Sequence, residues 1–293
     1  SDFEQIARIE VQRLATRNQG PLEIACWSLP KGTGRSPTAI GVAASGELVR
    51  DMADVCHDAG ADCETIDASA CALVRAALVM IGPREGQLWG VLDLGERQTR
   101  LAVCLGDTPV LVRSLGDGGR GWTRRLAEEL KISEDAAEVH KCDVGIEPST
   151  RGVRRTGAAD PQLIAHPDGA ARKELGAILF SALRGSLGRL VTEIERSYSY
   201  VLSCHPAAKP LDLLMTGGGA SMRGLVGFLG ESLGIGVRSM SEGGSADECR
   251  LSFGQRAGGA MGSTASSSAA AGGSASYDRF STAIGLALEG CPR

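Results

Sequence analysis

Two glycine-rich turns are the segments of this 293-residue sequence whose residue types could do chemistry. The first follows the apolar run 88–94 and reads Gly95-Glu96-Arg97-Gln98-Thr99. The second follows the apolar run 211–215 and reads Thr216-Gly217-Gly218-Gly219. Glycine lets backbone N–H groups approach a phosphate closely, and amides at a turn or a helix start carry partial positive charge. Two such turns far apart in the chain predict a nucleotide held between two parts of a domain.

Asp93 lies near the end of the first apolar run, two residues before Gly95. The pattern leaves two interpretations open. One is an ordinary strand that ends in a glycine turn, with Asp93 capping backbone amides. The other is a phosphate loop, in which Asp93 would hold a hydrated Mg²⁺ and Gly95 and the amides after it would face the phosphates. Thr99 lies in the next strand, where its hydroxyl could simply support the turn.

Three consecutive glycines between an apolar strand and a helix form the second candidate. Strand–glycine–helix is the nucleotide-binding arrangement of α/β folds, although a tight packing turn is the plain alternative. The segment matches neither Gly-x-Gly-x-x-Gly nor the P-loop pattern, which argues against a dinucleotide enzyme and a P-loop NTPase. No serine-hydrolase or zinc-protease motif accompanies it. Glu138 and Lys141 stand three apart on a predicted helix, either as a solvated ion pair or as contacts to a ribose or base.

The elements that must position these residues alternate between helices and strands. Before residue 86 we expect helices over 1–14, 45–59 and 69–80, and strands over 22–29, 38–44 and 63–67. In the helix over 45–59 the apolar residues expected to face inward are Leu48, Met52, Val55 and Ala59. Ile6 is expected on the buried stripe of the first helix. This first third is predicted to be a small α+β unit.

From residue 86 onward the pattern predicts three strands (88–94, 99–105, 110–114), followed by a helix over 122–130. Ser133 is expected to cap the next helix, with two acidic residues in its first turn. A polar connection over 149–169 precedes a long helix over 171–202. A strand over 211–216, a helix over 222–233 and a short strand over 236–240 follow. The Gly-, Ala- and Ser-rich stretch 254–276 is expected to be a flexible loop, and 280–288 a final helix.

Composition indicates which kinds of partner and which cellular compartment to expect. The net charge is −4 with no long basic run, so we expect no nucleic-acid partner. No uninterrupted apolar stretch reaches membrane-spanning length, so we expect no direct membrane insertion. The nine cysteines are scattered and none forms Cys-x-x-Cys. They are expected to serve as small buried hydrophobes in a reducing cytosol.

In this order, the motifs resemble the actin-like ATPase superfamily and, within it, the PilM family of type IV pilus and type II secretion machines. The matching segments run along nearly the whole chain: 93–99, 112–123, 132–133, 137–141, 190–200, 214–225 and 280–288. The resemblance implies an α/β, actin-like (ribonuclease H-like) two-lobed fold with a small inserted α+β subdomain. Residues 1–85 would be the remainder of the first lobe, including that subdomain at about 22–63. Residues 86–293 would form the second lobe, with its flexible loop at 254–276.

The resemblance also implies roles for individual residues. Asp93, Gly95 and Thr99 would lie at phosphate and Mg²⁺, with Asp93 as the metal contact. Glu138 and Lys141 would lie near ribose and adenine, and the adenosine loop would comprise Gly217, Gly218 and Gly219. The cofactors would be ATP and Mg²⁺. The partner would be the cytoplasmic tail of a PilN-like inner-membrane protein, with self-association as a further option. The protein would then be cytoplasmic and held at the inner membrane through that partner.

Two features depart from the family pattern. The family's first phosphate loop would precede Ser1, so ATP and Mg²⁺ are implied for a chain that carries such a segment. The stretch 65–70 contains no glutamine to orient water, although Asp67 or Ser69 could substitute. At most a weak ATPase is therefore expected, and no catalytic residue is assigned. The alternatives are a degenerate actin-like module that binds protein without nucleotide, and an actin-superfamily kinase or cell-division protein.

Overall fold

The computed structural model describes residues 2–14, 20–34, 36–148 and 169–240. The predicted loop 254–276 and helix 280–288 lie outside the described residues, as does nearly all of the connection 149–169. The described elements are, in chain order, α1 (Asp2–Leu14), β1 (Leu22–Ser28), β2 (Ala39–Ser45), α2 (Gly46–Asp58), α3 (Ser69–Ile81), β3 (Leu88–Leu94), β4 (Gln98–Leu105), β5 (Thr108–Asp117), α4 (Gly119–Leu130), α5 (Glu134–Asp143), α7 (Gly169–Cys204), β6 (Pro210–Thr216), a 3₁₀ turn η1 (Gly218–Ser221), α8 (Leu225–Leu233) and β7 (Gly236–Ser239).

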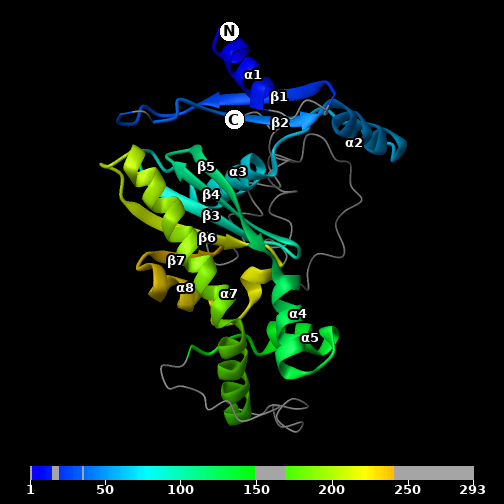
Figure 1. The fold of residues 1–293 in the computed structure, drawn as a ribbon, viewed down its shortest axis with the longest axis vertical. Helices are drawn as coiled ribbons and strands as arrows, with labels where there is room; N and C mark the ends of the chain where they lie inside the picture. The colour runs from blue at the N-terminus through cyan, green and yellow to red at the C-terminus, as the bar shows by residue number, and fades with distance from the viewer. Residues whose placement is uncertain (1, 15–19, 35, 149–168, 241–293) are drawn as a thin grey trace.

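A five-stranded sheet in the order β5-β4-β3-β6-β7 organises residues 88–239 (Figure 1). β3 pairs antiparallel with β4 and parallel with β6, and β6 pairs parallel with β7. Every residue of β3 is buried. A strand covered on both faces needs a continuous apolar sequence, which is what Leu88–Leu94 supplies around its single aspartate.

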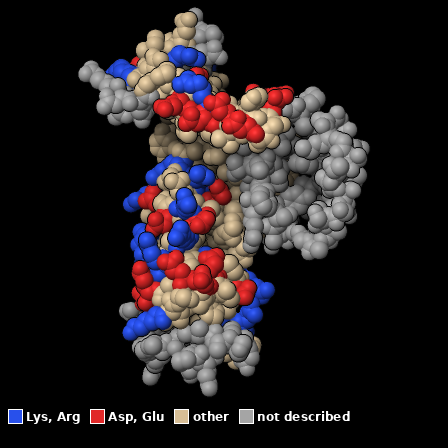
Figure 2. Space-filling view, turned by 90° about the vertical axis from the view of Figure 1, so that its right-hand side faces the viewer, with Lys and Arg blue, Asp and Glu red and all other residues tan. Residues whose placement is uncertain are grey.

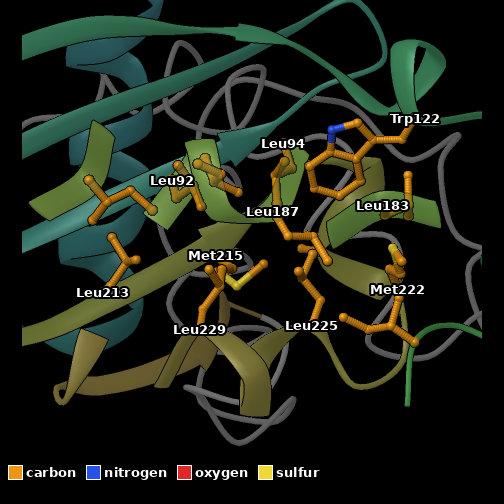
Figure 3. Packing of buried hydrophobic residues seen from close by; sticks show 14 of the residues in the cluster. Leu92, Leu94, Trp122, Leu183, Leu187, Leu213, Met215, Met222, Leu225 and Leu229 are labelled. Carbon is orange, nitrogen blue, oxygen red and sulfur yellow. The ribbon is translucent and has the colours of Figure 1, made fainter. Parts of the chain in front are cut away.

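Alternate side chains of the sheet enter two separate cores, as the period of two in a strand requires. Leu92 and Leu94 point toward α4, α7 and α8, where they pack with Trp122, Leu187 and Leu225 (Figure 3). On the other face, Trp89 and Val91 pack with α3, a helix made mainly of small and apolar residues. The sheet is thus the middle layer of a three-layer α/β structure.

α7 is a core helix of 36 residues. By length and composition alone it could also cross a membrane. Its regularly spaced leucines are nevertheless buried in the larger apolar core, among them Leu175, Leu179, Leu183, Leu187 and Leu190. That packing explains the apolar stripe of the helix without a bilayer.

Most predicted elements from residue 86 onward are confirmed, with ends shifted by a few residues. Ser133 caps α5 as expected, since its Oγ accepts a hydrogen bond from the Ala136 amide. The predicted strand over 63–67 is wrong, because those residues form neither helix nor strand. The expectation of buried cysteines is also wrong for the described part of the chain: of its seven free thiols, Cys104 is buried, whereas Cys63 and Cys142 are exposed.

The elements α1, β1, β2 and α2 form what we call the small unit. Its antiparallel strand pair lies across one end of the sheet (Figure 1). Trp27 Nε1 in β1 donates to the Pro109 carbonyl of β5 at 2.9 Å, and the Thr33 amide donates to the Cys204 carbonyl at 2.8 Å. The inward orientation expected for α2 is wrong: Leu48, Met52 and Val55 are 53%, 50% and 68% exposed. Ala59 and, in α1, Ile6 are exposed as well.

This contrast between the two regions gives a stability test. Leu187→Ala removes a fully buried side chain and should lower the free energy of unfolding by about 2–5 kcal/mol. Leu48→Ala on the exposed side of α2 should change it by less than about 0.5 kcal/mol. Urea unfolding followed by circular dichroism would measure both, and a large loss for Leu48→Ala would contradict the exposed position of that side chain.

Candidate functional site

The two glycine turns meet because β3 and β6 are parallel neighbours. Their register places Asp93 directly beside Thr216, so the chain leaves both strands at the same edge of the sheet. Turns at the carboxyl ends of adjacent strands form the usual binding crevice of open α/β sheets. The juxtaposition of Gly95 with Gly217–Gly219, expected from the order of the motifs, follows from this single pairing.

The three glycines of the second turn differ in whether the surrounding atoms leave room for a side chain. Gly217 has φ +85°, and a Cβ there would lie 2.6 Å from both Asp93 Oδ1 and the Leu94 carbonyl. A Cβ on Gly219 would lie 2.8 Å from Leu94 Cβ. A Cβ on Gly218 would meet no atom within 4 Å. Close packing therefore requires glycine at positions 217 and 219. Gly218 faces open space, so packing does not explain why a glycine stands there.

The first turn is held against the start of α4 by backbone contacts. The Gly95 amide donates to the Gln98 carbonyl, and the Gly95 carbonyl accepts from the Gly119 amide at 2.9 Å. A Cβ on Gly118 would lie only 2.3 Å from the Gly95 carbonyl oxygen. The absence of a side chain at Gly118 therefore lets α4 begin in contact with the turn.

Lys141 is the buried centre of a polar network that joins α4 to α5. Its side chain is only 7% exposed, and its Nζ donates to Glu138 Oε2 at 2.6 Å, to Thr123 Oγ1 at 2.8 Å and to the Gly119 carbonyl at 3.1 Å. An ammonium group has three donors, and all three are used here. Lys141 therefore fixes the position of its neighbours and has no further proton to offer a ligand.

Glu138 is the member of this network that reaches solvent, since its side chain is 50% exposed. Partial burial acts to raise its pKa, but hydrogen bonds from Lys141 and Thr123 outweigh that and hold the pKa below its usual value. Cys142 Sγ contacts Glu138 Oε1 at 3.4 Å. Partial shielding from water and this neighbouring carboxylate raise the pKa of the Cys142 thiol, so the thiol stays protonated at neutral pH.

A pocket of about 490 Å³ opens between these elements. It brings together five of the eight predicted site residues, Gly95, Glu138, Lys141, Gly218 and Gly219. They come from the β3–β4 turn, from α5 and from the β6–α8 turn. The first and the last of these segments are more than a hundred residues apart in the sequence. Its other lining residues are Glu96, Gly119, Arg120, Thr123, Glu134, Asp135 and Cys142.

The remaining predicted residues lie beside the pocket and do not line it. Asp93 is buried behind Gly217, and its Oδ2 is 3.5 Å from Arg100 Nη1. Burial raises the pKa of Asp93, with Arg100 acting in the opposite direction. Thr99 Oγ1 donates to the Asp117 carbonyl at 2.8 Å, which supports the plain interpretation of that hydroxyl as a support of the turn.

The residues present fit a nucleoside better than a protein-held metal. Gly218 leaves room in the pocket wall, and Glu138 offers a carboxylate to hydroxyl groups such as those of a ribose. Among the residues described, no group of three or more His, Cys, Asp or Glu could hold a metal ion. Asp93 could contribute one oxygen to a hydrated Mg²⁺ that is otherwise bound to phosphates, in competition with Arg100.

Asp67, one of the two candidates for orienting water, is engaged in structural contacts. Its carboxylate accepts from Arg75 Nη2 at 2.6 Å and from the Ala68 amide at 2.7 Å. These contacts start α3, which begins two residues later. The carboxylate of Asp67 is thus engaged by groups of the protein itself.

Sequence reasoning missed several pocket residues. Thr123 lies inside a predicted helix, and no local pattern marks it as a partner of Lys141. Glu134 and Asp135 were expected only as charges favouring the helix start. The contact of Gly119 with Gly95 joins residues 24 apart in the sequence. Long-range contacts of this kind leave no signal in residue spacing.

No protein-family model matches the chain, and no curated protein sequence matches it. A solved structure described as the PilM–PilN type IV pilus biogenesis complex matches 100% of this chain and 73% of its own, with a TM-score of 0.64 and 20% identity. The ethanolamine utilization protein EutJ of Carboxydothermus hydrogenoformans matches with a TM-score of 0.45, 18% identity and coverage of 67% and 57%. MreB5 of Spiroplasma citri bound to AMPPNP matches with a TM-score of 0.48 and 14% identity, over 72% of this chain and 65% of its own.

The first of these matches shows the fold, whereas the TM-scores of the other two are too low to support a conclusion. The chain has the actin-like α/β fold, as its resemblance to the PilM family implied. At 20% identity the likeness extends to the architecture and leaves the activity and partner open.

The difference in available space at Gly217 and Gly218 can be tested by substituting each glycine with alanine. Gly217→Ala should lower the free energy of unfolding by about 1–3 kcal/mol or more, because it combines positive φ with a close contact. Gly218→Ala should leave it nearly unchanged. Thermal and urea unfolding of the two variants would decide, and equal stabilities would contradict the packing role of Gly217.

The pKa of Glu138 gives a second test. Because that pKa is lowered in the folded state, the stability contributed by ionised Glu138 is present above the pKa of an unfolded glutamate. It should be lost as the pH falls through the lower folded value. Glu138→Gln should thus destabilise the protein at pH 7, and the difference from the unmutated protein should shrink toward pH 3. Urea unfolding across that range would measure it, with Glu128→Gln on the exposed side of α4 as control. A pH-independent difference would contradict the proposed network.

Proposed function

We propose that this protein is an actin-like scaffold that binds an adenine nucleotide and a protein tail at a type IV pilus or type II secretion platform. The observation that carries the nucleotide part is the convergence of five predicted site residues on one pocket. The actin-like fold supports it, because the two glycine turns occupy the strand ends where such folds open their crevice.

The nucleoside is proposed to lie between Gly218, Gly219 and the α5 residue Glu138. Gly218 would allow close approach of the base or sugar, and Glu138 would accept hydrogen bonds from ribose hydroxyls. Lys141 would act by fixing Glu138, since its own donors are used within the protein. The phosphates would extend toward Gly95 and Arg120. Slow hydrolysis or none is proposed, because Asp67 is held by Arg75.

The partner is proposed to be the cytoplasmic tail of a PilN-like inner-membrane protein, which would place this protein at the inner face of that membrane. The support is the likeness over the full chain to a PilM–PilN complex together with the resemblance of the sequence motifs. Bound nucleotide would bias the chain toward one arrangement and thereby change the affinity for the tail.

One observation favours the alternative of an actin-like module that binds protein without nucleotide. The pocket carries four carboxylates, from Glu96, Glu134, Asp135 and Glu138, against the two cations of Arg120 and Lys141. An excess of negative charge opposes a polyphosphate, and the pairing of Asp93 with Arg100 opposes Mg²⁺. The two functions are separated by whether nucleotide stabilises the folded protein.

Thermal unfolding of the intact protein with ATP–Mg²⁺ and with adenosine tests the nucleotide site. Ligand at one hundred times its Kd should add about 2.7 kcal/mol of stability, which is a rise in Tm of several degrees. Gly218→Val should abolish this rise without lowering the Tm of the free protein. The matched control is Gly227→Val on α8, where a side chain also meets open space but lies outside the pocket. No rise with either ligand would favour the nucleotide-free module.

Binding of the partner tail gives a separate test. A synthetic peptide with the cytoplasmic tail sequence of a PilN-like protein should bind with an affinity that changes when ATP–Mg²⁺ is added. Fluorescence anisotropy would measure the Kd in both conditions, with Gly218→Val as the variant that loses the nucleotide effect. An unchanged Kd would overturn the regulatory part of the proposal.

A further inference from the structure

α2 carries an apolar row that the described part of the chain leaves uncovered. Leu48, Met52 and Val55 are each at least half exposed and follow each other at spacings of four and three residues. Such spacing places them on one line along a helix, within about 60° of arc. Isolated exposed apolar residues are ordinary, but three in one row form a surface on which a partner can pack.

The other side of α2 already has its partner, so the row does not belong to the contact with β1 and β2. The residues of α2 that are buried or half-buried are Gly46, Val49, Ala53 and Cys56, and they form a separate line on the helix. These four side chains are small or medium in size, which lets the helix lie close to the strand pair. Rotating α2 to cover Leu48, Met52 and Val55 would expose that line.

The small unit cannot cover the row from within, because it has little interior. Among the described residues, both apolar core clusters draw their members from residue 73 onward. β1 and β2 contain no fully buried residue. A two-stranded pair with a helix on it gains stability from further apolar contacts, and a partner lying along α2 would supply them.

Charge identifies the chemistry of that partner. Glu47, Asp51, Asp54 and Asp58 are all exposed and form a second row, again within about 60° of arc and about 100° from the apolar row. Asp62 and Glu64 continue the acidic character just after the helix. Figure 2 shows Asp and Glu gathered in a band on the small unit, whereas the region below it carries mixed signs. We call the two rows together the acidic–apolar face of α2.

We infer that the acidic–apolar face of α2 binds a basic amphipathic helix of a partner protein. The partner's apolar side chains would pack on Leu48, Met52 and Val55, and its Lys or Arg side chains would lie beside the row of carboxylates. Helix-in-groove partners of this type present residues at spacings of three and four, which matches the spacing of the apolar row. This inference is independent of the nucleotide site.

The same charges disfavour the other occupants. Two copies of this face would bring eight carboxylates together, which opposes self-pairing through α2. An anionic bilayer surface would repel the acidic row, because such surfaces attract basic segments. A protein segment of opposite charge is the occupant that satisfies both rows at once.

The probe for this test is a synthetic 18-residue helical peptide with leucines at spacings of three and four and lysines elsewhere. Fluorescence anisotropy with the intact protein would give its Kd at low and moderate salt. Two comparison peptides are a version with glutamate in place of lysine and a scrambled sequence of the same composition. The basic helix should bind at least tenfold more tightly than either, and more weakly as salt rises.

Two variants of α2 test each row separately. Met52→Ser with Val55→Ser, and Asp51→Asn with Asp54→Asn, should each weaken binding at least tenfold. The matched controls lie on other helices: Val139→Ser removes an exposed apolar residue of α5, and Glu128→Gln with Glu129→Gln removes two carboxylates of α4. The controls should bind like the unmutated protein, and circular dichroism should show all variants folded.

Several results would overturn the inference. One is equal binding of the basic peptide to the α2 variants and to the unmutated protein, since it would mean attraction to overall charge. Others are equal binding of the scrambled peptide and no binding at all. Sedimentation showing a dimer that Val55→Ser dissociates would identify a second copy as the occupant. Flotation with anionic vesicles lost in the same variant would identify a membrane. Because none of these measurements involves nucleotide, their failure is distinct from failure of the ATP–Mg²⁺ test.

Discussion

The parallel pairing of β3 with β6 is the constraint on which the rest of the structure depends. It joins strands more than a hundred residues apart and sets Asp93 beside Thr216. Both glycine turns then leave the sheet at one edge, and Gly217 lies so close to Asp93 and Leu94 that a side chain there would clash with them. Burial of β3 on both faces makes this pairing strong, since α3 covers one side and α4, α7 and α8 cover the other. A pocket at this edge is a consequence of how the sheet is connected.

A buried lysine sets the opposite wall of that pocket. Lys141 holds the start of α4, through the Gly119 carbonyl and Thr123, to Glu138 on α5. The Gly119 amide in turn donates to Gly95, so one chain of contacts runs from the β3–β4 turn to α5. A buried ammonium is stable only when all its donors are satisfied, which ties this wall to a single geometry. The half-exposed carboxylate of Glu138 is thereby positioned by Lys141 and Thr123, which line the same pocket.

The small unit is built on a different principle from the sheet. It attaches through a few hydrogen bonds, such as that from Trp27 to Pro109, and has no fully buried strand residue of its own. Its helix α2 turns small residues toward the strand pair and larger apolar residues outward. One end of the molecule is therefore a three-layer core with a pocket. The other end exposes the larger apolar side chains of α2.

The sequence alone determined the elements with a strong repeating pattern. The buried strands β3 and β6, the leucine stripe of α7, and the Ser133 cap were predictable because local periodicity and capping chemistry define them. The two glycine turns were recognisable as candidates for the same reason. Tertiary structure alone decided that all three N–H donors of Lys141 bond to groups of the protein itself. It also decided that Gly218 faces open space whereas Gly217 does not. It also decided which side of α2 faces outward. Those properties depend on contacts between residues far apart in the chain, and residue spacing carries no record of such contacts.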